Sequence, residues 1–156
     1  MKLRISWRAK LSDSKDLPRV ERITGKMNTR WGEGTVVIPA PLEVDEIMRK
    51  IPKGKLVTVN EIRAALAKKH GATIGCPITT GIFTLIAARA AGEDEAEGKK
   101  RVTPYWRTLK GQGEVNPKYP GGVDAQRLRL EAEGHTVVAR GKRVVVQDYE
   151  GKLARL

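Results

Sequence analysis

Apolar residues recur at helical spacing in several stretches of the chain. The clearest stretch predicts a helix over residues 42–51, because its apolar positions fall at i, i+3, i+4 and i+7. These positions are Val44, Ile47, Met48 and Ile51. A second helix is predicted to run to His70, since residues 58–61 have the Ser/Thr-x-x-Glu form of a capping box and Gly71 stops the helix.

A third helix is predicted to begin at Pro77, because proline suits the first turn of a helix. Its inward face is expected to hold the apolar residues Ile78, Ile82, Phe83, Ile86 and Ala90. The hydroxyl-bearing residues on the other side are expected to be Thr79, Thr80 and Thr84. The second and third helices, with the short turn between them, form a candidate helix-turn-helix.

Two further helices are predicted outside this pair. A short one covers residues 6–11, and a longer one covers residues 123–133 and is ended by Gly134. The longer helix has an imperfect apolar side, made of Ala125, Leu128, Leu130 and Ala132. After the third predicted helix, residues 92–100 are polar. We interpret their acidic cluster, Glu93, Asp94, Glu95 and Glu97, as solvated.

Strand patterns are short and lie near the ends of the chain and after the third helix. Residues 35–38 form one short predicted strand. Residues 101–110 and 114–119, joined by a Gly-Gln-Gly turn, are predicted to run out and back as a wing. Residues 135–147 predict a β-hairpin with a two-residue turn at Gly141-Lys142. The pattern therefore predicts a mainly α fold with small β elements, α+β in class, built as a winged helix-turn-helix.

The same pattern divides the chain into three parts. Residues 1–41 are a basic N-terminal extension anchored by Trp7 and Trp31, residues 42–134 are the helix-turn-helix domain, and residues 135–156 are the C-terminal hairpin and tail. Trp7 either packs onto the core or stacks on a base.

Charge narrows the class of partner. Lys and Arg number 30 against 18 Asp and Glu, a net charge of +12, which favours a polyanion, most often nucleic acid. The chain has one cysteine, Cys76, so an intrachain disulfide is excluded. Because His70 and His135 are the only histidines, we also expect no metal site and no cofactor.

We expect the charged N-terminus not to be a secretory signal, and residues 74–88 are too short to span a bilayer. We expect a cytoplasmic monomer.

Four segments in register resemble one family. Residues 51–58 (Ile-Pro-Lys-Gly-Lys-Leu-Val-Thr) resemble the Pro-x-Gly-x-Val opening of the DNA-binding domain of alkylguanine-DNA alkyltransferases, the methylated-DNA–protein-cysteine methyltransferases. Residues 103–107 (Thr-Pro-Tyr-Trp-Arg) resemble that family's Pro-Cys-His-Arg active-site motif. Residues 119–122 (Tyr-Pro-Gly-Gly) are similar to its Tyr-Ser-Gly-Gly loop, and residues 130–134 to its Leu-x-x-Glu-Gly helix end. The resemblance covers residues 42–134 and implies a fold like the alkyltransferase C-terminal domain.

The active-site motif departs from the family at its two reactive positions. Tyr105 stands where the family has its alkyl-accepting Cys, and Trp106 where it has the activating His. Alkyl transfer needs a thiolate prepared by a neighbouring base, which a phenol and an indole cannot supply at neutral pH. We therefore predict no enzyme activity and no catalytic residue at this motif.

The resemblance implies a binding role instead. Alkyltransferase-like proteins, a branch that replaces the Cys, bind guanine alkylated on its 6-oxygen and flag it for nucleotide excision repair. The implied partners are double-stranded DNA carrying alkylated guanine and nucleotide excision repair proteins, with the protein associated with the nucleoid when bound to DNA. Pro77 falls where the family has an Arg that wedges into the duplex, and Val59 where it has a Tyr. An apolar wedge can unstack a base step, so either another residue helps to flip the base or the DNA is bound unflipped.

Each candidate DNA- or lesion-binding residue also has a structural interpretation. Tyr105 and Trp106 either line a base pocket or fill the space of the missing Cys-His pair as core. Arg107 either holds the wing in place or contacts a phosphate. Glu133 matches the acid that orients the family's His; with Trp106 present, only a helix-end role is expected of it.

The remaining candidates lie at turns and helix starts. Tyr119, Gly121 and Gly122 either cover a lesion pocket or form a tight turn that requires glycine. Thr58, Thr79 and Thr80 either donate to phosphates or cap helices. Two other functions stay open, a general DNA- or RNA-binding protein and an alkyltransferase that uses Cys76.

Overall fold

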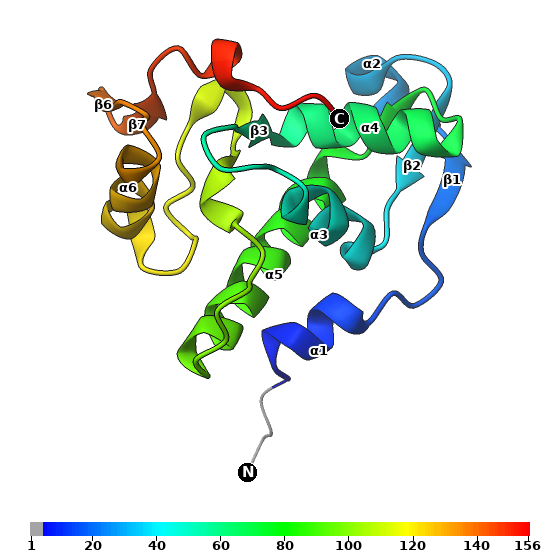
Figure 1. Cartoon of the computed structure of the whole chain (residues 1–156). Helices are drawn as coiled ribbons and strands as arrows, with labels where there is room; N and C mark the ends of the chain where they lie inside the picture. Colours follow the sequence, from blue (N-terminus) through cyan, green and yellow to red (C-terminus); the bar gives the residue numbers. More distant parts are fainter. Residues whose placement is uncertain (1–4) are drawn as a thin grey trace.

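The structure, a computed structural model, describes residues 5–156 and has an α+β fold (Figure 1). The helices are α1 (Trp7–Ser12), α2 (Met27–Trp31), α3 (Pro41–Arg49), α4 (Val59–His70), α5 (Pro77–Ala96) and α6 (Gly122–Ala132), with 3-10 turns η1 (Tyr105–Arg107), η2 (Gly111–Gly113) and η3 (Tyr149–Lys152). The strands are β1 (Arg19–Arg22), β2 (Thr35–Ile38), β3 (Val57–Thr58), β4 (Ile74–Gly75), β5 (Thr108–Leu109), β6 (Val137–Arg140) and β7 (Arg143–Val146). Within the described residues they form sheets in the orders β1-β2-β4, β3-β5 and β6-β7.

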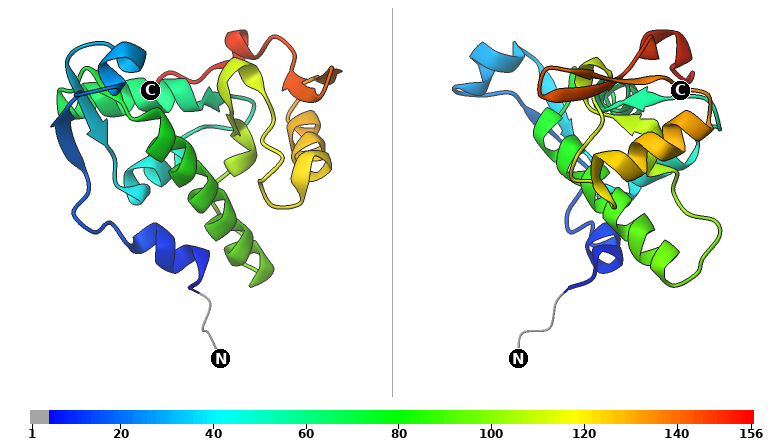
Figure 2. Two further views of the ribbon diagram at one scale, coloured as in Figure 1. Left: turned by 180° about the vertical axis from the view of Figure 1, so that it is seen from behind. Right: turned by 90° about the vertical axis from the view of Figure 1, so that its left-hand side faces the viewer.

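Helix α5 runs through the middle of the molecule and contacts α1, α3, α4 and η1 (Figures 1 and 2). Its buried stripe consists of small residues, Thr80, Thr84, Ala87, Ala88, Ala90 and Ala91. The expected inward face was therefore wrong near the start of the helix, where Ile78 is 54% exposed and Ile82 is 50% exposed. Small side chains let α5 approach its neighbours closely. The packing gained in this way outweighs the burial of the two isoleucines and determines which face of α5 points inward.

Helix α4 confirms the predicted capping and stop signals. The Thr58 hydroxyl accepts a hydrogen bond from the Asn60 N–H (3.2 Å), and the Glu61 carboxylate accepts one from the Thr58 N–H (2.8 Å). Gly71 ends the helix in the left-handed region with φ at 66°. Residues 71–76 then lead into α5, so the predicted order of helix, turn and helix is present.

The predicted wing was wrong in its strand pairing. Strand β5 pairs in parallel with β3, through Val57 with Thr108 and Thr58 with Leu109, and not with residues 114–119. The returning segment instead reaches the C-terminal hairpin, where Glu114 bridges Val145. Parallel pairing of β5 with the strand before α4 is a long-range contact that the local pattern did not reveal.

Residues 5–41 contribute structure to both sides of the central helices. The predicted strand at residues 35–38 is confirmed as β2, which pairs in parallel with β4 and antiparallel with β1. Strand β1 and helix α2 were not predicted, because β1 is exposed at every position and shows no apolar alternation. Trp31 packs against a cluster of Ile23, Val36 and Cys76.

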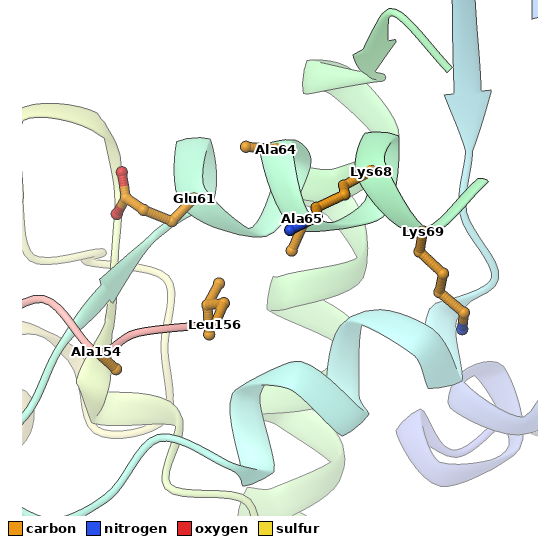
Figure 3. Close-up of a pocket in the computed structure, with 7 residues that line it drawn as sticks. All are labelled: Glu61, Ala64, Ala65, Lys68, Lys69, Ala154 and Leu156. Carbon is orange, nitrogen blue, oxygen red and sulfur yellow. The ribbon is translucent and has the colours of Figure 1, made fainter. Parts of the chain in front are cut away.

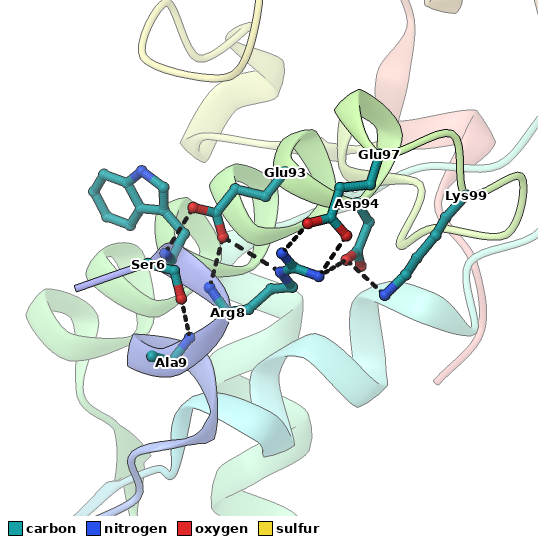
Figure 4. A network of polar contacts seen from close by, with 8 residues as sticks. Ser6, Arg8, Ala9, Glu93, Asp94, Glu97 and Lys99 are labelled. Carbon is teal, nitrogen blue, oxygen red and sulfur yellow. Dashed lines mark hydrogen bonds and ion pairs between the residues drawn. The ribbon is translucent and has the colours of Figure 1, made fainter. Parts of the chain in front are cut away.

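Helix α1 is attached to the C-terminal half of α5 by a polar network (Figure 4). The N–H groups of Trp7 and Arg8 donate to the carboxylate of Glu93 at 3.0 and 2.9 Å. The Arg8 guanidinium also pairs with Asp94 and Glu97. The interpretation of this acidic cluster as solvated was therefore incomplete, since it binds the first turn of α1. Trp7 packs against the main core, which matches the first of its two interpretations and not stacking on a base.

The C-terminal segment confirms the predicted hairpin and corrects one helix face. Strands β6 and β7 pair antiparallel from Val137 with Val146 to Arg140 with Arg143, which leaves Gly141 and Lys142 as the turn. In α6 the buried residues are Gln126 and Leu130, whereas Leu128 is 71% exposed and Ala132 is also exposed. The weak apolar period of this helix did not identify its inner face.

In the part of the chain that the structure describes, no helix has the length and apolar character needed to cross a membrane. Nor do three or more His, Cys, Asp or Glu side chains of residues 5–156 gather where they could hold a metal ion.

The contacts of Glu93 predict that this carboxylate holds α1 in place. The Glu93→Gln substitution is expected to speed hydrogen exchange at the Trp7 and Arg8 amides about five- to tenfold, the factor for the ~1–1.4 kcal/mol of a typical hydrogen bond. Residue-resolved hydrogen exchange measures this. The matched control is Glu46→Gln, which removes an exposed carboxylate on α3 and leaves these amides unaffected. Equal exchange rates in both variants would contradict the role of Glu93.

Candidate nucleic-acid interface

The segment 103–107 is held against α3 and α5. The Thr103 hydroxyl donates to the buried Asp45 carboxylate of α3 at 2.6 Å. Tyr105 follows in the η1 turn with 3% of its surface exposed, and its hydroxyl donates to Glu95 of α5 at 3.2 Å. Burial raises the pKa of the Tyr105 phenol, which therefore stays neutral at physiological pH.

Tyr105 is enclosed by other aromatic rings. Its ring meets that of Trp106 edge-on at 5.4 Å between centroids and that of Tyr119 edge-on at 5.8 Å. Edge-to-face pairs of this kind contribute about 0.5–1.5 kcal/mol each beyond the area they bury. Of the two interpretations of Tyr105, the structure matches the one in which the ring fills core space.

Trp106 and Arg107 both bind Glu133, at the C-terminus of α6. The Trp106 indole N–H donates to Glu133 at 2.8 Å, and Arg107 donates to the same carboxylate through Nε and Nη2 and to the Ile51 carbonyl at 2.8 Å. The expectation that Glu133 keeps only a helix-end role was wrong, because an indole N–H can donate where an imidazole N–H would. Of the two interpretations of Arg107, the structure matches the one in which its side chain holds this segment in place.

Burial and hydrogen bonding oppose each other at Glu133. Burial raises the pKa of its carboxyl, but hydrogen bonds from Arg107, Trp106 and the Gly54 N–H outweigh burial and hold the pKa below its usual value. The carboxylate is therefore charged at neutral pH and neutralised by Arg107, whose side chain is only 14% exposed.

Arg129 of α6 is a site residue that sequence reasoning missed. Its guanidinium lies over the Trp106 ring at 4.3 Å and over the Tyr105 ring at 5.4 Å, and it pairs with Glu95. Cation–π contacts contribute about 0.5–2 kcal/mol, more when they are shielded from water. No local pattern indicates that Arg129 and Glu95 meet, since α5 and α6 are far apart in the sequence.

The Tyr-Pro-Gly-Gly loop is a tight turn around a buried ring. Tyr119 is 2% exposed, and burial raises its pKa to about 12, although the neighbouring polar side chains of Thr84 and Asn116 lower it in part. Gly121 and Gly122 have φ values of 80° and 73°, which L side chains rarely adopt. A Cβ at Gly121 would also lie 2.5 Å from that of Ala125, so glycine is required there.

A groove of about 440 Å³ lies where the first turns of α4 and α5 meet the loop of residues 110–118. Its apolar lining comes from Val59, Pro77, Ile78, Gly81, Ile82 and Leu85, and its basic lining from Arg63, Lys110 and Lys118. Among the described residues the lining includes no carboxylate. Apolar surface edged by positive charge matches a nucleic acid, whose base faces are apolar and whose backbone is negative.

The groove collects some of the predicted site residues and not others. Pro77 and Val59, the two positions where the family has an Arg and a Tyr, both line it. Thr84 and Asn116 line it as well, and both adjoin the Tyr119 side chain. Tyr105, Trp106 and Arg107 do not line it. The groove therefore meets the aromatic cluster at Tyr119, through Thr84 and Asn116.

The predicted threonines point inward. Thr58 is 2% exposed and caps α4, and Thr80 is fully buried. The hydroxyls of Thr79 and Thr80 are buried without a hydrogen-bond partner. The placement of Thr80 and Thr84 on the outer side of α5 was therefore wrong, because these residues form part of its buried stripe.

Sequence reasoning missed the residues that take the outer positions. Ile78, Ile82, Arg63 and Lys118 line the groove. The available signal was the position of the isoleucines after Pro77 and of Lys118 in the loop before Tyr119, whereas no local signal indicated Arg63 on α4. The isoleucines were assigned to the core, because apolar bulk is usually buried.

Cys76 is placed as a packing residue. It is 6% exposed, lies among Ile23 and Val36, and its sulfur accepts from the Thr79 N–H at 3.5 Å. His70, a conceivable activating base, is instead bonded to Glu43 at 2.7 Å. This surrounding offers no route for a bulky alkylated base to the thiol.

A larger hollow of about 680 Å³ lies elsewhere, between α4 and the C-terminal tail (Figure 3). It is lined by Glu61, Ala64, Ala65, Lys68, Lys69, Ala154 and Leu156. These side chains include none of the motif positions, and the hollow is open to solvent. Its volume therefore does not make it the functional site.

The pKa of Glu133 predicts a pH-dependent contribution to stability. Because the folded pKa is lower than the unfolded value of about 4.3, Glu133 stabilises the fold above that pH, and the stabilisation is lost as pH falls through the folded pKa. Glu133→Gln is expected to lower the free energy of unfolding at pH 7 by about 2–3 kcal/mol and to flatten its dependence on pH below ~4.3. Urea unfolding between pH 3 and pH 7 measures both.

The control for this prediction lies on the same helix. Glu131 is exposed and pairs with Arg127, so Glu131→Gln should change stability by less than about 1 kcal/mol at any pH. If Glu133→Gln behaves like Glu131→Gln, the carboxylate is not the anchor described above.

Comparison with known proteins found similarity at the level of solved structures. No protein-family model matches the chain, and no curated protein matches it significantly. The chain is similar to a crystal structure of Atl1 from S. pombe in complex with damaged DNA containing O6-carboxymethylguanine, with 19% identity and a TM-score of 0.49. It is similar to a second structure, S. pombe ATL in complex with DNA, with 18% identity and a TM-score of 0.46. Each match covers 74% of this chain and 94% of the other.

Proposed function

We propose that this protein is a non-enzymatic binder of duplex DNA of the alkyltransferase-like type, which recognises guanine alkylated on its 6-oxygen and marks it for repair. The observation that carries the proposal is the groove at the first turns of α4 and α5. It combines two positions of the family resemblance, Pro77 and Val59, with exposed apolar residues and a basic edge.

The charge of the groove fits a duplex. Arg63, Lys110 and Lys118 lie around an apolar floor, in a chain whose net charge is +12. Phosphate contacts made by such side chains supply most of the affinity for DNA and set the position of the protein along it. Discrimination must then come from the surface between these charges.

The apolar surface fits a base that carries an alkyl group. Ile78 and Ile82 stand about half exposed on the first turns of α5, beside Pro77. Apolar side chains inserted at a base step can unstack it, and an added alkyl group buries more surface against them than an unmodified guanine does. The groove volume of about 440 Å³ lies within the range that holds small molecules, which includes a single base.

The motif itself supports binding without chemistry. A nucleophile must reach the alkyl carbon, but the Tyr105 hydroxyl is buried, neutral and bonded to Glu95. Trp106 has no basic nitrogen that could take a proton. The aromatic residues support the neighbouring groove and leave the bound base unchanged.

Paired oligonucleotides test the proposal. We expect a duplex with one O6-alkylguanine to bind about tenfold or more tightly than the unmodified duplex, within the ~1–3 kcal/mol typical of one base-specific feature. Fluorescence anisotropy titrations at a fixed salt concentration give both dissociation constants. Equal constants would reduce the function to general DNA binding, and a preference for structured RNA would replace it.

The groove itself is tested by a double substitution. Ile78→Asp with Ile82→Asp is expected to weaken binding of either duplex about tenfold or more, because carboxylates repel phosphates and remove the apolar contact. The matched control is Leu42→Asp with Leu128→Asp, which places two carboxylates at exposed leucines of α3 and α6 that do not line the groove. Similar effects of both changes would show that the groove is not the contact.

Mass spectrometry tests the absence of alkyl transfer. After incubation with the alkylated duplex, the mass of the chain should stay unchanged, because Cys76 is buried among apolar residues and Tyr105 is neutral. A small thiol reagent applied to the unfolded chain shows that a modified Cys76 would be detected. A gain of one alkyl group on Cys76 in the folded chain would establish the enzyme alternative.

A further inference from the structure

The β6-β7 hairpin carries a basic tip outside the segment that resembles the alkyltransferases. The tip consists of the Gly141-Lys142 turn and the residues on either side of it, Arg140 and Arg143. Its three basic side chains, Arg140, Lys142 and Arg143, are all exposed. Among residues 5–156, none of these three side chains forms an ion pair with a carboxylate. Arg140 and Arg143 are opposite one another in the strand register, where like charges repel. Uncompensated cations clustered at a turn attract anions.

The hairpin is attached to the loop that borders the groove. Arg143 donates to the Gln112 side chain at 3.3 Å, and Gln112 lies in the η2 turn beside Gly111 and Lys110, which line the groove. The Val115 N–H donates to the Val144 carbonyl at 2.8 Å, and Glu114 bridges Val145. The basic tip and the groove are therefore two parts of one connected structure.

The views of the ribbon agree with this placement. The hairpin lies beside α6 and the loop that follows β5, on the side of the molecule away from α2 and β1 (Figures 1 and 2). A ligand long enough to extend from the groove past residues 110–113 meets the hairpin next.

We propose that the β6-β7 hairpin acts as a wing that contacts the phosphate backbone of the same duplex that occupies the groove. The inference rests on the proposed function, because the duplex must first lie in the groove. The tip carries Arg140, Lys142 and Arg143 around a glycine, without an apolar anchor of the kind that protein interfaces bury at their centre. Exposed cations instead suit the regularly spaced charges of a DNA backbone.

The role predicted for residues 101–119 as a wing thus passes to the hairpin. The segment 101–119 does not form a strand pair of its own, since β5 pairs with β3 and Glu114 bridges β7. The hairpin has the antiparallel pair and the protruding basic turn that this role requires. Its contribution is nonspecific affinity, because phosphate contacts carry no sequence information.

Salt dependence of binding tests the wing. The triple variant Arg140→Gln, Lys142→Gln and Arg143→Gln removes three charges and keeps three long polar side chains. If each contacts a phosphate, the slope of log affinity against log salt becomes shallower by about 2.7, at ~0.9 per contact. The ratio of dissociation constants at 200 and 50 mM salt then falls about 40-fold relative to the unaltered chain.

A matched variant removes the same charge elsewhere. Lys99, Lys100 and Arg101 follow the C-terminus of α5, about 30 Å from the groove end of this 20-residue helix. Changing all three to Gln should leave the slope as in the unaltered chain. A slope that is unchanged in the hairpin variant, or equally shallow in both variants, would overturn the wing while leaving the groove intact.

A measurement on the unaltered chain guards against misfolding of the variants. Lysine acetylation with and without the duplex is expected to show at least about fivefold protection of Lys142 and none of Lys100, because a phosphate contact covers the amine. Equal protection of the two lysines would overturn the wing. If the unaltered chain binds no duplex at all, the proposed function fails and the wing fails with it. If the chain binds the duplex but Lys142 is no better protected than Lys100, only the wing fails.

Discussion

The close packing of α5 against its neighbours determines which of its side chains face outward. Its inner face is a stripe of alanines and threonines, which allows α1, α3 and α4 to approach closely. The side opposite this stripe then carries Ile78 and Ile82 outward, although both are large and apolar. Leaving two isoleucines half exposed forgoes about 1 kcal/mol or more each in burial. The fold thus presents an apolar surface at the start of the helix, between basic residues, and the proposed DNA-binding function depends on this surface.

Two acidic residues, Glu133 and Glu95, hold the aromatic pair Trp106 and Tyr105 in place. Glu133 binds the Trp106 indole and Arg107 together, and Glu95 binds Tyr105 and Arg129. A carboxylate left unpaired at this depth would be costly, so each acid needs a cation beside it. The indole N–H of Trp106 therefore connects the motif to the end of α6 through Glu133.

Local signals in the sequence predicted the elements that local chemistry decides. The capping box at Thr58, the left-handed Gly71 and the Gly141-Lys142 turn each depend on residues close in sequence, and each was confirmed. The inner face of α5, the pairing of β5 with β3 and the contact of α1 with Glu93 depend on residues far apart in sequence. At the candidate site, the resemblance pointed to Pro77, which lines the groove, and to the turn around Tyr119. It could not show that Tyr105 is enclosed or that Ile78 and Ile82 replace it as the exposed apolar residues.

Under the proposed function, the separation of the groove from the aromatic motif determines which surface would distinguish an alkylated base. An enzyme must bring the alkyl carbon to a nucleophile, which requires an open pocket at position 105, whereas Tyr105 here is 3% exposed. A binder needs only a larger gain in contact area with the modified base than with the plain one. That gain is available at an exposed apolar surface such as Ile78 and Ile82, without opening the core. A sealed core around Tyr105 and an exposed apolar surface at the first turns of α5 therefore both agree with the proposed binding function.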